Sequence, residues 1–209
     1  MAEICSVVIG DPPALWADLG FVVDGLAVHV SGVCHLLGGA SPGITAWSVR
    51  GLPPGVQSLD GLAFDAPAAE PRPTADHPNG VVGLDHLVVA TPDLGRTIGS
   101  LEEAGVECRR LRDAGTPAMP MRQAFFRFGP VVVEVVGPPE PSGGGPPRLV
   151  GLAYTVRDLA ETARLLGARL RPVKDAVQPG RRIATLDTAA GSSVPLAFMS
   201  GETGPQRAE

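Results

Sequence analysis

The sequence predicts an α+β fold in which repeated βαβββ units form a curved mixed sheet around a cleft. Two stretches, 84–137 and 149–201, share one order of apolar runs and turns, and the chain contains 27 glycines and 22 prolines. Only 4% of its 209 residues are aromatic, so the core must consist mainly of Val, Leu, Ala and Ile. Frequent turns between β-branched runs favour short strands over long helices, and the internal repeat indicates the architecture.

Each copy opens with a strand that runs directly into a short helix. The strands are LDHLVVAT (84–91) and LVGLAYTV (149–156), and Asp93 and Asp158 follow at the N-cap position. Apolar residues then recur at helical spacing, at Leu94, Ile98 and Leu101 in the first copy and at Leu159, Ala163 and Leu166 in the second. A glycine, Gly105 or Gly167, follows each helix and predicts its end, because glycine readily adopts the left-handed conformation.

Three further strands complete each copy. VECRRLR (106–112) and ARLRPVK (168–174) predict the next strand, and a hairpin follows over 122–137 or 181–201. A weaker copy of the same order begins at the N-terminus with ICSVVIGDPPALWADLGF, and the segment after it is rich in Pro, Ala and Asp. The predicted parts are a degenerate βαβββ unit at 1–53, a connector at 54–82, a domain of two units at 83–201 (83–138 and 148–201) and a flexible tail at 202–209.

The two clear copies resemble the vicinal oxygen chelate superfamily. The resemblance is carried by LDHLVVATPDLGRTIGSLEEAG, QAFFRFGPVVVEVVGP, LAYTVRDLAETARLLG and GRRIATLDT, which together span about 84–201. This superfamily includes glyoxalases, extradiol dioxygenases and metal-free bleomycin resistance proteins. The resemblance implies a glyoxalase-like fold, with two units pairing around an open cleft into which any metal ligands point. One scaffold hosts several chemistries, so the fold alone names no reaction.

His86 and Glu134 are the candidate catalytic residues and the candidate metal ligands. They stand at the positions that resemble the family's first-strand and last-strand ligands, and an imidazole with a carboxylate suits a divalent metal such as Zn, Fe, Ni or Mn. An acid within the run VVVEVVG also needs a partner or solvent access. The alternative is that the two side chains bond each other or a ligand without a metal, and could still act as a general base.

The second copy lacks the matching ligands. The position equivalent to His86 is Gly151, and the position equivalent to Glu134 falls at or beside Phe198. The metal set is therefore expected to be incomplete, because tightly held metals usually have three or four protein ligands. Gln123 could add an amide oxygen, as in epimerase-like relatives.

Further residues are predicted to bind a substrate. Arg122 and Arg182 occupy matching places in the two hairpins, and an arginine in the cleft would hold a carboxylate or phosphate with two bonds. Arg181 and Arg182 must point to opposite faces of their strand, so one of them should face the cleft. The predicted substrate-binding residues are Arg122, Gln123, Tyr154, Arg182 and Phe198.

Composition excludes several classes of partner. The formal net charge of -5 and the absence of a long Lys/Arg run argue against nucleic-acid binding. No apolar stretch is long enough to span a membrane or to serve as a signal peptide, so a cytoplasmic protein is expected. Three widely spaced cysteines fit neither a disulfide framework nor a zinc pattern.

The sequence leaves three functions open. The first is a glyoxalase-like small-molecule binding protein or enzyme with an incomplete metal site and an unidentified ligand, which pairs into a homodimer if it follows its bleomycin-binding relatives. The second is a metal-dependent lyase, isomerase or dioxygenase that uses His86 and Glu134. The third is a non-catalytic interaction protein in which the N-terminal segment covers the cleft.

Overall fold

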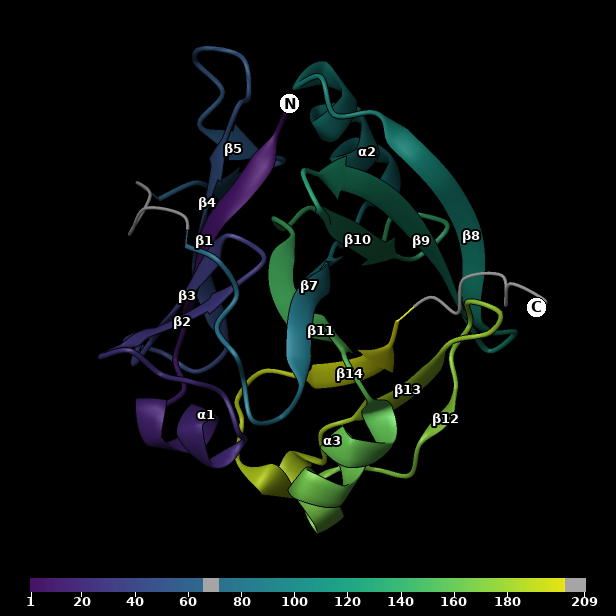
Figure 1. Cartoon of the computed structure of the whole chain (residues 1–209). Coiled ribbons are helices and arrows are strands. Elements are labelled where there is room, and N and C mark those ends of the chain that lie inside the picture. Colours follow the sequence, from purple (N-terminus) through teal and green to yellow (C-terminus); the bar gives the residue numbers. More distant parts are fainter. Residues whose placement is uncertain (66–71, 202–209) are drawn as a thin grey trace, which may run out of the picture.

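The structure is a computed structural model that describes residues 1–65 and 72–201 (Figure 1). Within these residues the strands form an eight-stranded, a four-stranded and a two-stranded sheet. Residues 66–71 of the predicted connector and the predicted tail at 202–209 lie outside the described residues.

The eight-stranded sheet consists of two βαβββ units. Its strands run in the order β12-β13-β14-β11-β7-β10-β9-β8. In each unit the first strand pairs in parallel with the last, and β7 pairs antiparallel with β11 at the middle of the sheet. The elements are β7 (Val81–Ala90), α2 (Leu94–Glu103), β8 (Cys108–Thr116), β9 (Met119–Phe128), β10 (Val131–Gly137), β11 (Arg148–Val156), α3 (Leu159–Leu166), β12 (Lys174–Asp175), β13 (Arg182–Thr185) and β14 (Leu196–Ser200). This arrangement confirms the predicted glyoxalase-like fold.

The predicted helix signals act as expected. The Asp93 carboxylate accepts a hydrogen bond from the Arg96 amide at 2.9 Å, and the Asp158 carboxylate accepts one from the Ala160 amide at 2.8 Å. Each N-cap thus satisfies an amide that has no partner within its helix. After the helices, Gly105 and Gly167 have φ values of 79° and 55°, which residues with a Cβ atom rarely adopt.

The prediction of a strand over 168–174 was wrong. Residues Gly167–Arg169 form a 3-10 turn, Leu170 makes an isolated bridge to Leu186, and a strand begins only at the two-residue β12. Pro172 lies between them and has no amide hydrogen to donate to a neighbouring strand. The second unit therefore has a much shorter second strand than the first, and the loop that follows β12 reaches the cleft instead.

The N-terminal segment forms its own sheet in the order β2-β3-β1-β4. Here β1 pairs in parallel with β3 and antiparallel with β4, whereas in each main unit the first strand pairs in parallel with the fourth. The element order is still β, α, β, β, β, and assignment as a degenerate unit remains a prediction. The elements are β1 (Glu3–Ile9), α1 (Pro13–Asp18), β2 (Ala27–Val30), β3 (Val33–Leu37) and β4 (Ile44–Arg50), followed by the short hairpin of β5 (Ser58–Leu59) and β6 (Leu62–Ala63).

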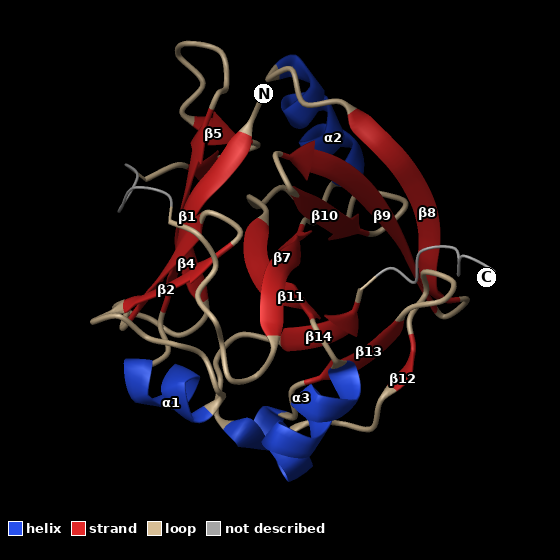
Figure 2. Ribbon diagram, in the orientation of Figure 1, coloured by secondary structure: helices blue, strands red, loops and turns tan. Residues whose placement is uncertain are grey.

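Three elements cover the outer face of the curved sheet (Figure 2). Helix α2 packs on β8, β9 and β10, helix α3 packs on β13 and β14, and the N-terminal sheet packs against β7 and β11. Aromatic rings fill this last contact: Phe21 lies 5.3 Å from Tyr154 and 6.4 Å from Phe198 between ring centroids. The inner face stays free for a site. No helix among the described residues has the length and apolar character needed to cross a membrane.

Candidate functional site

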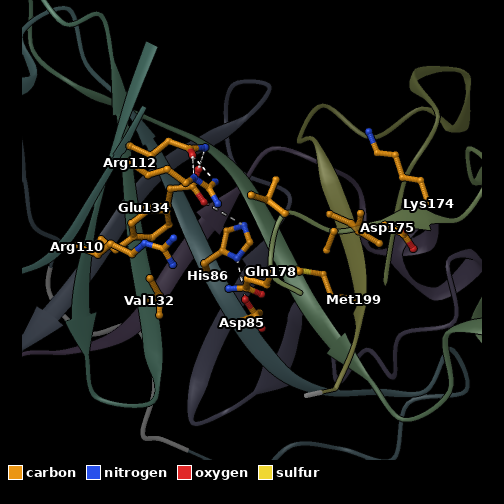
Figure 3. Close-up of a pocket in the computed structure, with 15 residues that line it drawn as sticks. Asp85, His86, Arg110, Arg112, Val132, Glu134, Lys174, Asp175, Gln178 and Met199 are labelled. Carbon is orange, nitrogen blue, oxygen red and sulfur yellow. Dashed lines mark hydrogen bonds and ion pairs between the residues drawn. The ribbon is translucent and has the colours of Figure 1, made fainter. Parts of the chain in front are cut away.

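The inner face of the eight-stranded sheet surrounds a cavity of about 490 Å³ (Figure 3). Both units of the same chain line it. One wall, from β7 to β10, is mainly polar and charged, and the opposite wall, from β12 to β14 and the loop after β12, combines apolar side chains with Lys174, Asp175 and Gln178. The lining residues are Asp85, His86, Arg110, Arg112, Gln123, Phe125, Val132, Glu134, Lys174, Asp175, Ala176, Val177, Gln178, Ile183 and Met199.

The structure brings together His86 and Glu134. His86 on β7 pairs with Val132 on β10, and Glu134 follows two residues later on the same face. The His86 Nε2 atom lies 3.6 Å from Glu134 Oε2, and both side chains are mostly buried, with 19% and 12% of their surface exposed. The two groups share a wall of the cavity, in reach of a molecule bound there.

Asp85 joins this pair through an irregularity in β7. Between β7 and β11 the register runs from Ala153 opposite His86 directly to Tyr154 opposite Leu84, so Asp85 is an extra residue on its strand. A bulge of this kind re-aims a side chain. Asp85 and His86 therefore both line the cavity although they are adjacent in sequence, and Asp85 Oδ1 lies 2.9 Å from His86 Nδ1.

A short polar relay holds Glu134 from the other side. The Gln123 amide donates through Nε2 to Glu134 Oε1 at 2.5 Å and accepts through Oε1 from Arg112 Nε at 2.8 Å. The amide can satisfy both neighbours only in this orientation, because a guanidinium only donates and a carboxylate only accepts. The Arg112 guanidinium also lies over the Phe125 ring, 5.4 Å from its centroid. The Glu134 carboxylate is thereby fixed without direct contact with a cation.

Asp85 is held in its ionised form. Burial alone would raise the pKa of its carboxyl, but hydrogen bonds from His86 and Arg181 and the charge of Arg181 outweigh this and hold the pKa far below its usual range. Arg181 Nη2 lies 2.6 Å from Asp85 Oδ2, and only 6% of the Arg181 side chain is exposed. The carboxylate and guanidinium therefore form a buried ion pair beside the cavity.

Six side chains thus form one line: Arg112, Gln123, Glu134, His86, Asp85 and Arg181. Each contact in this line is a hydrogen bond except the 3.6 Å separation between His86 Nε2 and Glu134 Oε2. Two guanidinium groups balance two carboxylates when the imidazole is neutral. The line then carries no net charge, and the His86–Glu134 gap is its one contact without a hydrogen bond.

The other sequence-predicted residues lie elsewhere. Arg122 is exposed and pairs with Asp113 at 2.8 Å, and Arg182 is exposed next to the buried Arg181. Tyr154 and Phe198 are fully buried in the aromatic contact with the N-terminal sheet, on the outer side of the main sheet. Of the predicted substrate-binding residues, only Gln123 lines the cavity.

Asp85, Arg110 and Arg112 were not predicted from the sequence. A signal for Asp85 was available, since strict alternation would put this acid on the same face as the apolar Leu87 and Val89. Arg110 and Arg112 belong to a run of basic residues in which alternation alone selects neither face. The Arg110 guanidinium forms no hydrogen bond or ion pair with any described residue, so it is free to meet a ligand.

The residues of the cavity do not fit a divalent metal. The positions equivalent to His86 and Glu134 in the second unit are Gly151 and Ala197, by their places in the pairing of β11 with β14, and neither has a donor atom. The Gln123 oxygen already accepts from Arg112. The described residues contain no group of three or more His, Cys, Asp or Glu side chains arranged to hold a metal ion. Asp85 is already paired with His86 Nδ1 and Arg181, and His86 and Glu134 alone are too few for tight binding.

Comparison with known proteins finds similarity of structure only. No family model matches the chain, and no curated protein matches it. Methylmalonyl-CoA epimerase from Mycobacterium tuberculosis is 19% identical over 58% of this chain and 89% of that chain, with a TM-score of 0.46. A hypothetical protein from Bacillus halodurans is 15% identical over 59% and 97%, with a TM-score of 0.45. A variant of the Streptomyces coelicolor epimerase in complex with 2-nitronate-propionyl-CoA is 18% identical over 58% and 98%, with a TM-score of 0.45.

Proposed function

We propose that the chain binds a small amphipathic organic acid in the cavity and that the His86–Glu134 pair accepts a proton from it without a metal. The observation that carries this proposal is the single break in the line of hydrogen bonds, the 3.6 Å gap between His86 Nε2 and Glu134 Oε2. A general base must reach its proton directly, and these two atoms are the part of the line that borders the cavity without a bonded neighbour.

The charges and the apolar surface of the cavity define the ligand class. Arg110 provides an unpaired guanidinium on one wall, which suits a carboxylate, phosphate or phenolate. The opposite wall presents Val177, Ile183 and Met199, which favour an apolar body. A ligand with an acidic head and an apolar body would place its head between Arg110 and His86.

Binding can be tested with the fluorescent anion anilinonaphthalene sulfonate, which combines an acidic head with apolar rings. We expect one saturable site, and Arg110→Gln should weaken binding roughly three- to tenfold, the equivalent of about 1 kcal/mol. Arg109→Gln is the matched control, because Arg109 pairs with Glu107 and lies outside the cavity. Equal effects of the two substitutions, or no saturable binding, would refute the binding site and favour an interaction protein.

Proton acceptance needs a second probe. Bound p-nitrophenol reports its own ionisation by its absorption spectrum, so transfer to the pair should raise the phenolate band at a pH where the free phenol is protonated. Glu134→Gln should remove this increase while anilinonaphthalene sulfonate still binds, because the substitution removes a negative charge but keeps the shape. An unchanged phenolate band in Glu134→Gln would remove Glu134 from the proton-accepting role.

Elemental analysis distinguishes the metal-free proposal from the metal-dependent alternative. We expect protein purified without chelators to contain well below one equivalent of zinc, iron, nickel or manganese. A full equivalent that is lost in His86→Ala would overturn the metal-free proposal and favour a lyase, isomerase or dioxygenase of the glyoxalase type.

A further inference from the structure

Arg181 is anchored on several sides before it meets Asp85. Its Nε donates to the Ser200 carbonyl oxygen at 2.8 Å, and its Nη1 donates to Gln178 Oε1 at 2.7 Å. Its Nη2 donates to Asp85 Oδ2 at 2.6 Å. These bonds reach the strand β14, the loop after β12 and the bulge in β7. The guanidinium therefore has a fixed orientation, and a fixed guanidinium offers only donors.

This anchor determines what Asp85 can do toward His86. Asp85 Oδ2 accepts from Arg181 and also from Thr155 Oγ1, at 3.1 Å. The other oxygen, Oδ1, faces His86 Nδ1 at 2.9 Å. An ionised carboxylate has no proton to donate, so the hydrogen of this contact must lie on Nδ1. The remaining ring nitrogen, Nε2, then faces Glu134 and the cavity.

We propose that Asp85 is a positioning residue which, held by Arg181, keeps neutral His86 in the Nδ1–H tautomer and so makes Nε2 the proton-accepting atom of the site. This inference deepens the proposed function, since it assigns the accepting atom, but the tautomer can be measured without any ligand. A carboxylate that orients a histidine in this way stabilises the imidazolium that forms after proton transfer.

The experiment is nitrogen NMR of the protein with ¹⁵N-labelled histidine, at a pH where the imidazoles are neutral. Protonated and unprotonated ring nitrogens have well-separated shifts, and His86→Gln identifies the resonances of His86 among the four histidines. We expect Nδ1 of His86 to be protonated and Nε2 to be unprotonated. The opposite assignment, or an even mixture of the two tautomers, would overturn the proposal.

Asp85→Asn gives a sharper test because Arg181 constrains the new amide. The amide oxygen must face the guanidinium, which only donates, so the NH₂ group must face His86 Nδ1. Nδ1 then has to accept, and the tautomer should reverse to Nε2–H. In the double variant Asp85→Asn, Arg181→Met the amide is free to turn, and its oxygen should accept from Nδ1 again and restore the original tautomer.

The controls separate orientation from misfolding and from the proposed function. Arg182→Met should leave the His86 shifts unchanged, because Arg182 is exposed and its side chain has no part in the Asp85 contacts. The shifts of buried His35 and His77 report in each variant whether the fold is retained. If Asp85→Asn leaves the tautomer unchanged in a folded protein, the positioning role is wrong. If the tautomer reverses but no organic anion binds, the positioning role stands and the proposed function fails.

Discussion

Replacing Arg181 by methionine should lower the free energy of unfolding by far more than is usual for an arginine in a predicted hairpin. The guanidinium and the Asp85 carboxylate are 2.6 Å apart, with 6% and 15% of their side chains exposed. Removing one partner of a buried pair leaves the other charge uncompensated, at a cost of about 3–5 kcal/mol. For a chain of this size we therefore expect a fall in the melting temperature of roughly 6–20 °C.

The matched control is Arg182→Met, one residue along the chain. Its side chain is exposed, so the free energy of unfolding should change by less than about 0.5 kcal/mol. Urea denaturation of both variants and the wild type at neutral pH measures the difference. Equal losses of unfolding free energy in the two methionine variants would refute a stabilising buried pair of Arg181 and Asp85.

The pH dependence of this loss follows from the sign of the Asp85 pKa shift. The pKa is lowered in the folded protein, so the pair's contribution is complete above the unfolded carboxyl pKa of about 4 and disappears as the pH falls through the folded value. The stability gap between wild type and Arg181→Met should therefore narrow in acid. A gap that stays constant from pH 7 down to about pH 2 would show that lost packing, and not lost charge, causes the destabilisation.

Two further predictions concern buried groups outside the cavity. Burial lowers the pKa of His35 from 6.5 to about 4, so acidification from pH 7 to pH 4 should cost up to about 3 kcal/mol of unfolding free energy. Urea denaturation over this pH range should show that His35→Leu lacks this loss. An equal loss in His35→Leu and in the wild type would contradict the prediction. The Tyr154 hydroxyl is buried without a hydrogen-bond partner among the described residues, so Tyr154→Phe should be neutral or stabilise by about 1 kcal/mol in thermal melting. Because Tyr154 lies on the outer side of the sheet, this variant should also bind anilinonaphthalene sulfonate as the wild type does, and weaker binding would return Tyr154 to the site.

The sequence predicted the main fold because its signals are local and occur twice. Strand, N-cap acid, amphipathic helix and terminal glycine recur in both units, and each element forms where its own residues favour it. The failure over 168–174 has a local cause as well, since Pro172 interrupts pairing. The pairing of the N-terminal strands was beyond prediction, because the same element order is compatible with the first strand pairing in parallel with the third strand, as in β1, or with the fourth, as in the main units.

The site was less predictable because its geometry depends on register. The family resemblance selected His86 and Glu134 as the candidate pair, and the structure brings them together. Strict alternation would put Asp85 on the face opposite His86, but one extra residue in a strand reverses the faces of the residues before it. The sequence also could not decide whether Arg181 or Arg182 faces the cleft, since two adjacent residues point to opposite faces and composition does not distinguish them.

Arginine side chains can balance the charges of the two carboxylates that lie close to the imidazole of the cavity. Asp85 and Glu134 bring two negative charges to a mostly buried line of side chains, and such charges need compensation. Arg181 compensates one directly and Arg112 the other through Gln123. A divalent cation at the His86–Glu134 gap would add two positive charges to a line that is already neutral. A single proton adds one, which an anionic ligand can balance, so the charges of this cleft are compatible with the proposed proton transfer from an acid bound beside Arg110 to the His86–Glu134 pair.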